Sequence, residues 1–475
     1  MEKYNNEKLK EFNQSLVGKN VAIIGLGVSN LPLLDYMNKY RAKVTVFDDR
    51  ELKDIDKNII DKLLDCNFDF SFGKDSLKKL KGFDYIFRSP SCLPTREELV
   101  SEKNRGAIVT TEIEMVLKLT PSKVIGVTGS DGKTTTTTII SEILKEDGHK
   151  VFLGGNIGIP LFDKIEEMRP EDIVVLELSS FQLMNMEASP EISIVTNITP
   201  NHLNIHKDYE EYIDSKKEIF KHQDRNGLLI INKDNDITRE FYKEAIGKYK
   251  FFTSKEKLDD GAFYDSDDNK IKLYSEKKCV YSFDTNKMKL IGIHNYENAA
   301  AAILSTFDLV KKESIDNVLS SFGGVEHRLE LVATTSENVK WYNDSVSSSP
   351  TRTIAGLKSF DGGNIILIAG GYDKNLDYEV IGPYIVDKCK ALVLLGSTSD
   401  KIENAVKNVL KKEKKDMPIV RCKSLDEVVQ KSNELSKKDD IVLFSPASAS
   451  FDMFKNFADR GEQFKKEVRK FFGHN

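Results

Sequence analysis

Residues 126–138 read GVTGSDGKTTTTT, a glycine-rich turn followed by a lysine and a run of threonines. The general phosphate-binding loop has a glycine, four free positions and then Gly-Lys-Ser/Thr. Gly132, Lys133 and Thr134 match the second half of that pattern, but Val127 stands where its first glycine belongs. The apolar residues KVIGVTG predict a strand before the turn, and TTTTTIISEILKEDGH predicts an amphipathic helix after it.

A strand, a tight turn and a helix mouth carrying a lysine are what a phosphate site needs. Phosphates bind where backbone N–H groups converge at a helix N-terminus and an ammonium reaches the outer oxygens. Gly129 and Gly132 permit backbone conformations closed to other residues, and the Thr134 hydroxyl is placed to bind Mg²⁺. Because threonines are poor helix formers, the run favours nucleotide binding over a plain strand-turn-helix.

Predicted strands and helices also alternate along the sequence before and after this loop. Short apolar runs such as VAIIGLG and KVTVFDD alternate with helix-like stretches in the first ~115 residues, which predicts a parallel sheet. A second block surrounds the quoted loop, and a third begins near Val325. We predict an α/β protein with domains at residues 1–115, 116–324 and 325–475.

The bulk composition limits the possible classes of function. The 475 residues are 40% hydrophobic and 31% charged, with a net charge of −5, so no global attraction to nucleic acid is expected. The basic run at residues 411–415 is interpreted as a solvated helix end. Five scattered cysteines and a polar N-terminus favour a reducing, cytoplasmic setting without a membrane segment.

Motifs along nearly the whole chain resemble those of the Mur ligases and the related folylpolyglutamate synthases, in which this loop register is normal. They are GVTGSDGKTTT, GGNIG (154–158), ELSSFQL (177–183), TPNHLNIH (199–206), YIDSKKEIF (212–220), GIHNYENAAAA (292–302), EHR (326–328) and WYNDS (341–345). SPASASFDMFKNFADRGEQF (445–464) is similar to the C-terminal stretch of the D-glutamate-adding members. This long match is the most specific of the set.

The resemblance implies a cytoplasmic, ATP-dependent amide ligase of peptidoglycan precursor synthesis. ATP would phosphorylate the L-alanyl carboxylate of UDP-N-acetylmuramoyl-L-alanine, and the amine of D-glutamate would displace phosphate from the acyl phosphate. Its three domains would be a Rossmann-like UDP-binding domain, a P-loop-type ATPase domain and a Rossmann-like amino-acid-binding domain. Phosphoryl transfer depends mainly on positioning and charge neutralisation.

The resemblance also implies catalytic and metal-binding residues. Lys133 would neutralise the phosphates, and two Mg²⁺ ions would be held by Thr134, Glu177, His202 and a carbamylated lysine. The family's tyrosine spacing from Tyr212 favours Lys216 for the carbamate, with Lys217 as the open alternative. Successive helical residues point about 100° apart, so only one of the two can face the metals.

The matching positions also imply three binding sets. ATP would be bound by Gly129, Ser130, Asp131, Gly132, Lys133, Thr134, Thr135, Asn295, Asn298, Arg328 and Asp344. The UDP-substrate would be bound by Gly27, Val28, Ser29, Asp48, Asp49, Arg50, Ser89, Asn156, Ser179 and Gln182. The amino acid would be bound by Lys374, Ser450 and Phe457.

Two positions depart from the family pattern. Ser91 replaces the glycine of an SPG turn, and Val346 replaces a second carboxylate-binding lysine that some members carry. Residues 347–349 or Arg352 are the candidates to compensate for that lysine. The stereochemistry of the amino acid is not readable from the sequence alone.

Three alternatives remain open. The chain could be another ligase of the superfamily, adding diaminopimelate or lysine, or a folylpolyglutamate synthase. GLGVSN (25–30) is half of a dinucleotide fingerprint, with an acidic pair following the next strand, so an NAD-dependent dehydrogenase is the alternative from another class. A nucleotide-binding module without catalysis would leave Glu177, His202 and Lys216 unexplained. We expect a monomer that binds neither nucleic acid nor membrane.

Overall fold

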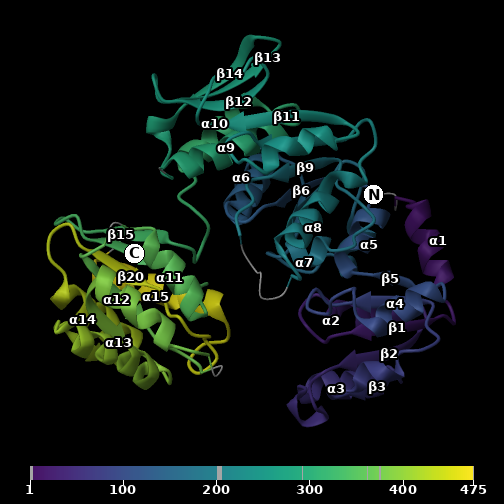
Figure 1. Ribbon diagram of the computed structural model, residues 1–475, viewed down its shortest axis with the longest axis horizontal. Coiled ribbons are helices and arrows are strands. Elements are labelled where there is room, and N and C mark those ends of the chain that lie inside the picture. Colours follow the sequence, from purple (N-terminus) through teal and green to yellow (C-terminus); the bar gives the residue numbers. More distant parts are fainter. Residues whose placement is uncertain (1–3, 201–205, 291, 361, 374–375, 474–475) are drawn as a thin grey trace. The chain divides into compact units, whose positions relative to one another are not determined.

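The computed structural model describes residues 4–200, 206–290, 292–360, 362–373 and 376–473 (Figure 1). The chain divides into two compact units, Met1–Phe322 and Gly323–Asn475. Three sheets, largely parallel, alternate with helices, which confirms the predicted α/β class. The first unit contains two of these sheets and the second unit contains the third.

The first sheet is entirely parallel, in the order β3-β2-β1-β4-β5. Its strand order reverses at β1, where Ile24 pairs with Phe47 of β2 on one side and Arg88 of β4 on the other. Ligands of open α/β sheets bind at such a reversal, beyond the carboxyl ends of the strands. The strands are β1 Asn20–Ile24, β2 Lys43–Asp48, β3 Asp69–Phe72, β4 Tyr85–Arg88 and β5 Ile108–Thr110; the helices are α1 Glu7–Ser15, α2 Leu31–Lys39, α3 Lys57–Asp65 and α4 Glu97–Asn104.

The central sheet has the order β14-β13-β12-β11-β10-β9-β6-β8-β7. Its strands are parallel from β7 to β12, and β12, β13 and β14 form an antiparallel meander at one edge (Figure 1). The strands are β6 Lys123–Thr128, β7 Val151–Gly155, β8 Ile173–Glu177, β9 Ile192–Val195, β10 Leu228–Asn232, β11 Lys248–Thr253, β12 Gly261–Asp265, β13 Lys270–Ser275 and β14 Lys278–Asp284. The helices are α5 Glu112–Leu119, α6 Lys133–Glu146, α7 Ser180–Leu183, α8 Tyr209–Lys221, α9 Ile293–Thr306 and α10 Lys312–Ser321.

The second unit is built on a sheet of order β15-β16-β20-β17-β18-β19, in which only the β15–β16 pair is antiparallel. Its strands are β15 Glu330–Thr334, β16 Lys340–Asn343, β17 Ile365–Ala369, β18 Cys389–Leu394, β19 Ile419–Arg421 and β20 Ile441–Phe444. Its helices are α11 Pro350–Lys358, α12 Gly382–Lys388, α13 Ser399–Glu413, α14 Leu425–Leu435 and α15 Phe457–Phe471.

The threonine-rich helix α6 is held by its packing against α9. The alanines at 299–302 are fully buried and share a core with Ile139, Ile140 and Ile143 of α6. Small alanine side chains let the two helices approach closely, and burial on this scale outweighs the poor helix propensity of threonine. Thr136 and Thr137 are themselves fully buried, and Thr136 donates a hydrogen bond to Asn298 of α9.

Two surface expectations can be compared with the structure. The basic run at residues 411–415 ends α13 and its lysines are exposed, so the prediction of a solvated helix end is confirmed. Across the described part of the chain, none of the helices is long and apolar enough to cross a bilayer.

A buried carboxyl joins α5 to the chain beyond β7. The Glu112 side chain is 5% exposed, and its Oε1 accepts hydrogen bonds of 2.8 Å from the N–H groups of Leu161 and Phe162. Burial raises the pKa of Glu112 to about 7, although those two N–H groups act in the opposite direction. The folded protein therefore binds this proton more tightly than the unfolded chain does.

This difference predicts a measurable pH dependence of stability. Between roughly pH 4.5 and 7 the folded state holds a proton that the unfolded chain releases, so the free energy of unfolding falls as pH rises. Glu112→Gln keeps an acceptor oxygen but cannot ionise. Relative to the wild type, the variant should gain about 2 kcal/mol in free energy of unfolding between pH 5.5 and 8. Urea denaturation at both pH values measures the gain, and parallel pH curves would contradict it.

Candidate active site

The loop between β6 and α6 can be built only with glycine at two positions. Gly129 has a φ of +148° and Gly132 a φ of +81°. A Cβ atom on Gly129 would lie 1.9 Å from Thr196 Oγ1, and one on Gly132 would lie 2.4 Å from Asn298 Oδ1. Both the backbone conformation and the close neighbours therefore exclude a side chain.

The chain that follows β9 holds the loop in place. Ser130 N donates to Asn197 O at 2.8 Å, and Asp131 N donates to Asn197 Oδ1 at 2.9 Å. The Thr196 hydroxyl donates to Asp131 O at 2.6 Å. Neighbouring strand ends of the central sheet thus fix the shape of the loop.

Two lysines reach the same carbonyl of this loop. Lys133 Nζ, at the start of α6, donates to Gly129 O and Ser130 O, both at 2.9 Å. Lys216 Nζ, from α8, donates to Gly129 O at 2.8 Å and lies 4.8 Å from the ring centroid of Tyr212. Two lysines 83 positions apart in the sequence therefore meet at one oxygen atom, Gly129 O.

Burial sets the protonation of Lys216. The side chain is only 2% exposed, and this burial lowers its pKa well below the ordinary value. The nearby charge of Lys133 lowers the pKa further, while Asp131 and Glu177 act in the opposite direction. A buried amine near another cation is favoured in its neutral form.

The neighbouring Lys217 points elsewhere. Its Nζ forms ion pairs with Asp214 at 3.4 Å and with Glu244 at 2.8 Å. The structure thus brings Lys216, and not Lys217, to the phosphate loop.

A second buried group lies at the end of β8, the strand beside β6. Glu177 is 1% exposed, and its Oε1 accepts a hydrogen bond of 2.7 Å from Asn156 Nδ2. Its Oε2 is buried and has no hydrogen-bond partner among the residues the structure describes. A carboxylate oxygen without a partner is costly to bury, so Glu177 is suited to receive a cation.

The short helix α7 follows Glu177 and begins with a capping box. Gln182 N donates to Ser179 Oγ at 3.3 Å, and Ser179 N donates to Gln182 Oε1 at 3.0 Å. His206 contacts the same helix, with its Nε2 2.9 Å from Ser180 Oγ and its ring stacked on Phe181. Reciprocal capping fixes the two side chains predicted to bind substrate.

Asn295 and Asn298 both project from the first turns of α9 and are buried. Asn298 Oδ1 accepts a hydrogen bond of 3.2 Å from Thr136 Oγ1, which places α9 against the loop. Thr134 and Thr135 are half-buried at the start of α6.

The residues predicted to bind the UDP-substrate lie where the strand order of the first sheet reverses. Asp48 Oδ2 accepts from Leu26 N at 2.8 Å, and the Arg50 guanidinium binds both Asp48 oxygens at 2.8 Å. Burial raises the pKa of Asp48, but these hydrogen bonds outweigh it and the pKa is lowered overall.

Ser89 lies at the end of β4 across the reversal, within 3.0 Å of where a Cβ on Gly25 would stand. The exposed loop carries Gly27 and Val28, with Ser29 half-buried behind them and Asp49 exposed beside Asp48.

In the second unit, Asp344 follows β16 and is 2% exposed. Its carboxylate accepts hydrogen bonds from Ser347 Oγ at 2.6 Å, Ser445 Oγ at 2.7 Å and Leu329 N at 3.3 Å, while burial raises its pKa. Arg328 directly precedes Leu329. Asp344 is thus fixed by the loops after its own and the neighbouring strand.

The loops that carry the predicted amino-acid site are joined by one buried arginine. Arg460 donates to Ser345 Oγ at 3.0 Å and Ser345 O at 2.8 Å, and to Ser448 O and Ala449 O at 3.0 Å. Ser450, which follows, is buried, and Phe457 at the start of α15 is 43% exposed.

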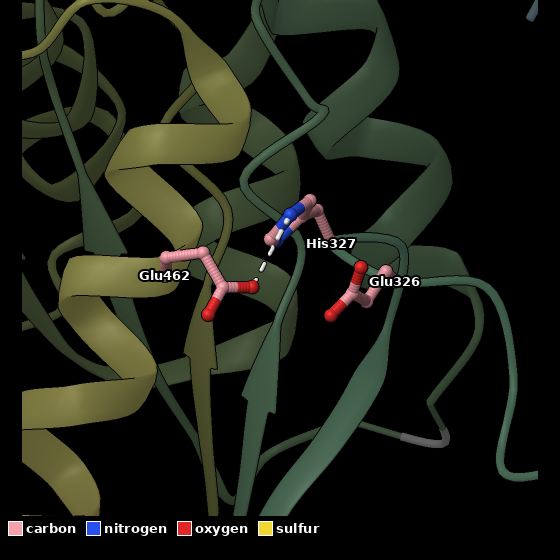
Figure 2. Close-up of side chains that lie close together, drawn as sticks. All are labelled: Glu326, His327 and Glu462. Atoms are coloured by element: carbon pink, nitrogen blue, oxygen red, sulfur yellow. Dashed lines mark ion pairs between the residues drawn. The ribbon is translucent and has the colours of Figure 1, made fainter. Parts of the chain in front are cut away.

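Figure 2 shows Glu326, His327 and Glu462, whose ligand atoms lie within 4.8 Å of one another. Lys465 Nζ contacts Glu326 at 2.7 Å and Glu462 at 2.6 Å, so an ammonium already balances these carboxylates. The arrangement is an ion-pair network and gives no support for a metal site.

The remaining predicted residues, His202 and Lys374, lie outside the described residues.

The sequence of this chain matches proteins of a known family. Residues 127–306 match the Mur ligase middle domain, and residues 327–448 match the domain described as Mur ligase, glutamate ligase domain. UDP-N-acetylmuramoylalanine–D-glutamate ligase of Clostridium tetani is 47% identical over 464 residues, which cover 98% of this chain and 99% of the relative. The enzyme of the same name from Acetivibrio thermocellus is 45% identical over 98% of this chain and 99% of the relative.

The chain belongs to the Mur ligase family.

Solved structures agree on the fold of this Mur ligase. UDP-N-acetylmuramate-alanine ligase of Thermotoga maritima has a TM-score of 0.53 at 18% identity and covers 96% of this chain and 100% of its own. Membership confirms the resemblance stated from the motifs and the predicted enzyme class, an ATP-dependent ligase that forms amide bonds.

Sequence reasoning did not find several residues that shape the site. Thr196 and Asn197 stand beside the predicted TPNHLNIH motif but resemble ordinary strand-end residues. Arg460 lies within a quoted motif, although its role as a buried link between loops was not foreseen. An arginine before a glycine in an amphipathic helix does not by itself indicate this role.

Gly129→Ala should disable the loop of this Mur ligase. The added Cβ would meet Thr196 Oγ1 at 1.9 Å and the Asn197 backbone at 3.1 Å, so the loop must move. Because displacement by 1 Å can cost about a hundredfold, ATP-dependent turnover should fall by at least roughly that factor. Gly148→Ala is the matched control, with a φ of +94° and no atom within 4 Å of the added Cβ. Equal activity in the two variants would contradict the account.

Proposed function

We propose that this Mur ligase joins D-glutamate to UDP-N-acetylmuramoyl-L-alanine, with conversion of ATP to ADP and phosphate. The names of the similar full-length enzymes support the choice of substrates. The observation that carries the reaction type is the meeting of Lys133, Lys216 and Glu177 at one edge of the central sheet. Such a reaction belongs to cytoplasmic peptidoglycan precursor synthesis.

The chemistry proceeds in two steps. The terminal phosphoryl group of ATP passes to the L-alanyl carboxylate, which forms an acyl phosphate and releases ADP. The neutral amine of D-glutamate then attacks the acyl carbon, the carbon–oxygen bond to phosphate breaks, and the amine nitrogen loses a proton. Lys133 would leave its loop carbonyls to neutralise the charge on the transferring phosphoryl group.

The residues present fit two Mg²⁺ ions. Glu177 supplies a buried oxygen that lacks a described partner, and Thr134 supplies a hydroxyl at the helix mouth. Together with His202 and a carbamylated Lys216, they would form a set dominated by oxygen, which Mg²⁺ prefers. When bound, the ions would offset the negative charge of the phosphates.

The environment of Lys216 supports the proposed carbamate. Its neutral amine can attack CO₂, so that a nitrogen–carbon bond forms and the nitrogen loses a proton. The product is an anion, which suits a site that already contains the Lys133 ammonium. An unmodified charged lysine would instead repel a metal ion.

The nucleoside and amino-acid subsites lie in different parts of the chain. Asp48 and Arg50 at the reversal of the first sheet would face the UDP moiety, with Asn156, Ser179 and Gln182 nearer the reacting end. Asn295, Asn298, Arg328 and Asp344 would contact ATP. Ser450, Phe457 and Lys374 would contact D-glutamate. Arg352 remains a candidate for the lysine that Val346 replaces, because its Nη1 donates to Val346 O at 3.3 Å.

Phosphate release tests the proposal. The wild type should release phosphate only when ATP, UDP-N-acetylmuramoyl-L-alanine and D-glutamate are all present. Separate reactions with L-glutamate, L-lysine and diaminopimelate distinguish the other members of the superfamily. Release with one of these amino acids, but not with D-glutamate, would refute the proposed substrate.

The two adjacent lysines of α8 form a matched pair of variants. Lys216→Ala should abolish phosphate release, and acetate should restore part of it by supplying a carboxylate in the vacated space. Lys217→Ala should be mild, because an ion pair near the surface contributes only about 0–1 kcal/mol. Activity in both variants would show that the carbamate is dispensable, and the reverse pattern would move it to Lys217.

The first sheet should bind a UDP-sugar and not NAD⁺. Arg50→Met removes a cation at the carboxyl end of β2 and should weaken binding of UDP-N-acetylmuramoyl-L-alanine about tenfold. Arg41→Met, before the opposite end of the strand, is the control and should leave the affinity unchanged. Calorimetric titration measures both. Tight binding of NAD⁺ without response to the UDP-sugar would favour a dehydrogenase.

A further inference from the structure

Arg88 is a buried cation in the first unit. It is the last residue of β4 and 3% exposed, and burial lowers the pKa of its guanidinium. None of the carboxylates among the described residues forms an ion pair with it. The charge of Glu114 acts on Arg88 only at a distance, without an ion pair. Since burying a charge costs free energy, its hydrogen bonds must supply most of the compensation.

The guanidinium instead contacts three backbone carbonyls from two segments. Its Nη2 donates to Met184 O at 2.7 Å, and both terminal nitrogens lie 3.4 Å from Phe181 O. Its Nη1 also donates to Cys92 O at 3.2 Å. The planar fork of arginine can serve several acceptors at once in fixed directions, which lysine cannot.

One of these segments is the turn that carries Ser89. Ser89 N donates to Ile24 O at 2.9 Å, and Cys92 N donates to Ser89 O at 3.0 Å. Arg88 therefore holds the far end of a turn whose near end is anchored to β1. This turn borders the strand-order reversal, where the UDP moiety is proposed to bind.

The other segment is the end of α7. Phe181 lies within this one-turn helix and Met184 directly follows it, and both supply carbonyl oxygens to Arg88. The start of the same helix carries the reciprocal Ser179–Gln182 cap. A contact at one end of a one-turn helix thus sets the position of the side chains at the other end.

We infer that Arg88 is a positioning residue for the UDP-substrate. Through one guanidinium it fixes the spacing between the Ser89 turn and the Ser179–Gln182 cap, so that both can hold the same ligand. The inference rests on the proposed function and deepens it. Arg88 acts through these two segments and needs no contact of its own with the substrate.

Michaelis constants for the three substrates test this role. Arg88→Met should raise the KM for UDP-N-acetylmuramoyl-L-alanine about tenfold or more, because the spacing is lost. The KM values for ATP and D-glutamate should stay within about twofold, since the phosphate loop is held by other contacts. Arg88→Lys should fall between the wild type and Arg88→Met, because it retains the charge without the fork.

Lys103→Met is the matched control. Lys103 Nζ pairs with Glu187 Oε1 at 2.9 Å, so this ion pair also joins the first sheet's helices to the chain after α7, but both side chains are more than half exposed. The variant should leave all three KM values unchanged. Melting temperatures of every variant separate lost stability from lost spacing.

Calorimetric titration of the UDP-substrate without ATP or D-glutamate completes the test. If the wild type binds it and Arg88→Met binds it equally well, the inference on Arg88 is wrong while the proposed function stands. A uniform rise of all three KM values with a lower melting temperature would likewise reduce Arg88 to a structural role. If Arg88→Met does not fold, Arg88→Lys decides by the same criteria. A wild type that does not bind the UDP-substrate would overturn both proposals.

Discussion

The carbonyl of Gly129 accepts hydrogen bonds from two lysines, and the central site depends on that arrangement. Lys133 reaches it from the helix that follows the loop, and Lys216 reaches it from α8. Two ammonium groups that share one oxygen repel each other, so burial and the neighbouring charge favour the neutral form of Lys216. The loop therefore does more than present a phosphate-binding turn. It also lies beside a lysine whose amine is favoured in the neutral form, which the proposed carbamate requires.

This environment requires strand ends from several parts of the chain. Thr196 and Asn197, which follow β9, form hydrogen bonds that hold the loop. Glu177 ends the neighbouring strand β8, and Asn298 of α9 lies close to Gly132. Helix α7 then leads from Glu177 to the carbonyls that Arg88 binds at the edge of the first sheet. These contacts link the proposed nucleoside site to the proposed phosphoryl-transfer site.

Much of this could be predicted from the sequence. Alternating apolar runs predicted the α/β class, and the residues around Lys133 predicted the strand, turn and helix that the structure shows as β6, the loop and α6. The tyrosine spacing favoured Lys216 over Lys217, and the structure brings the former to the loop. Periodicity could not show that Arg88 would turn inward from a strand end, because two of its three carbonyl acceptors are more than ninety residues away. Arg460 was missed for a related reason, since backbone acceptors leave no sequence signature.

The packing of one sheet against another could not be predicted from local patterns. Three domains were predicted, and each predicted range carries one of the three sheets. The structure adds that a continuous core joins the first two sheets within one compact unit. Buried residues of the first sheet, such as Val21 and Phe87, pack in the same cluster as Phe162 and Leu176 of the central block. Local hydrophobic periodicity identifies each sheet but not which sheets share a core.

The central claim is that Lys216 becomes a carbamate, and isotope labelling tests it most directly. The protein would be equilibrated with ¹³C-bicarbonate and its carbonyl region observed by NMR. The account predicts a protein-bound carbamate signal in the wild type and in Lys217→Ala, and its loss in Lys216→Ala. Absence of the signal from the wild type, or its survival in Lys216→Ala, would contradict the account.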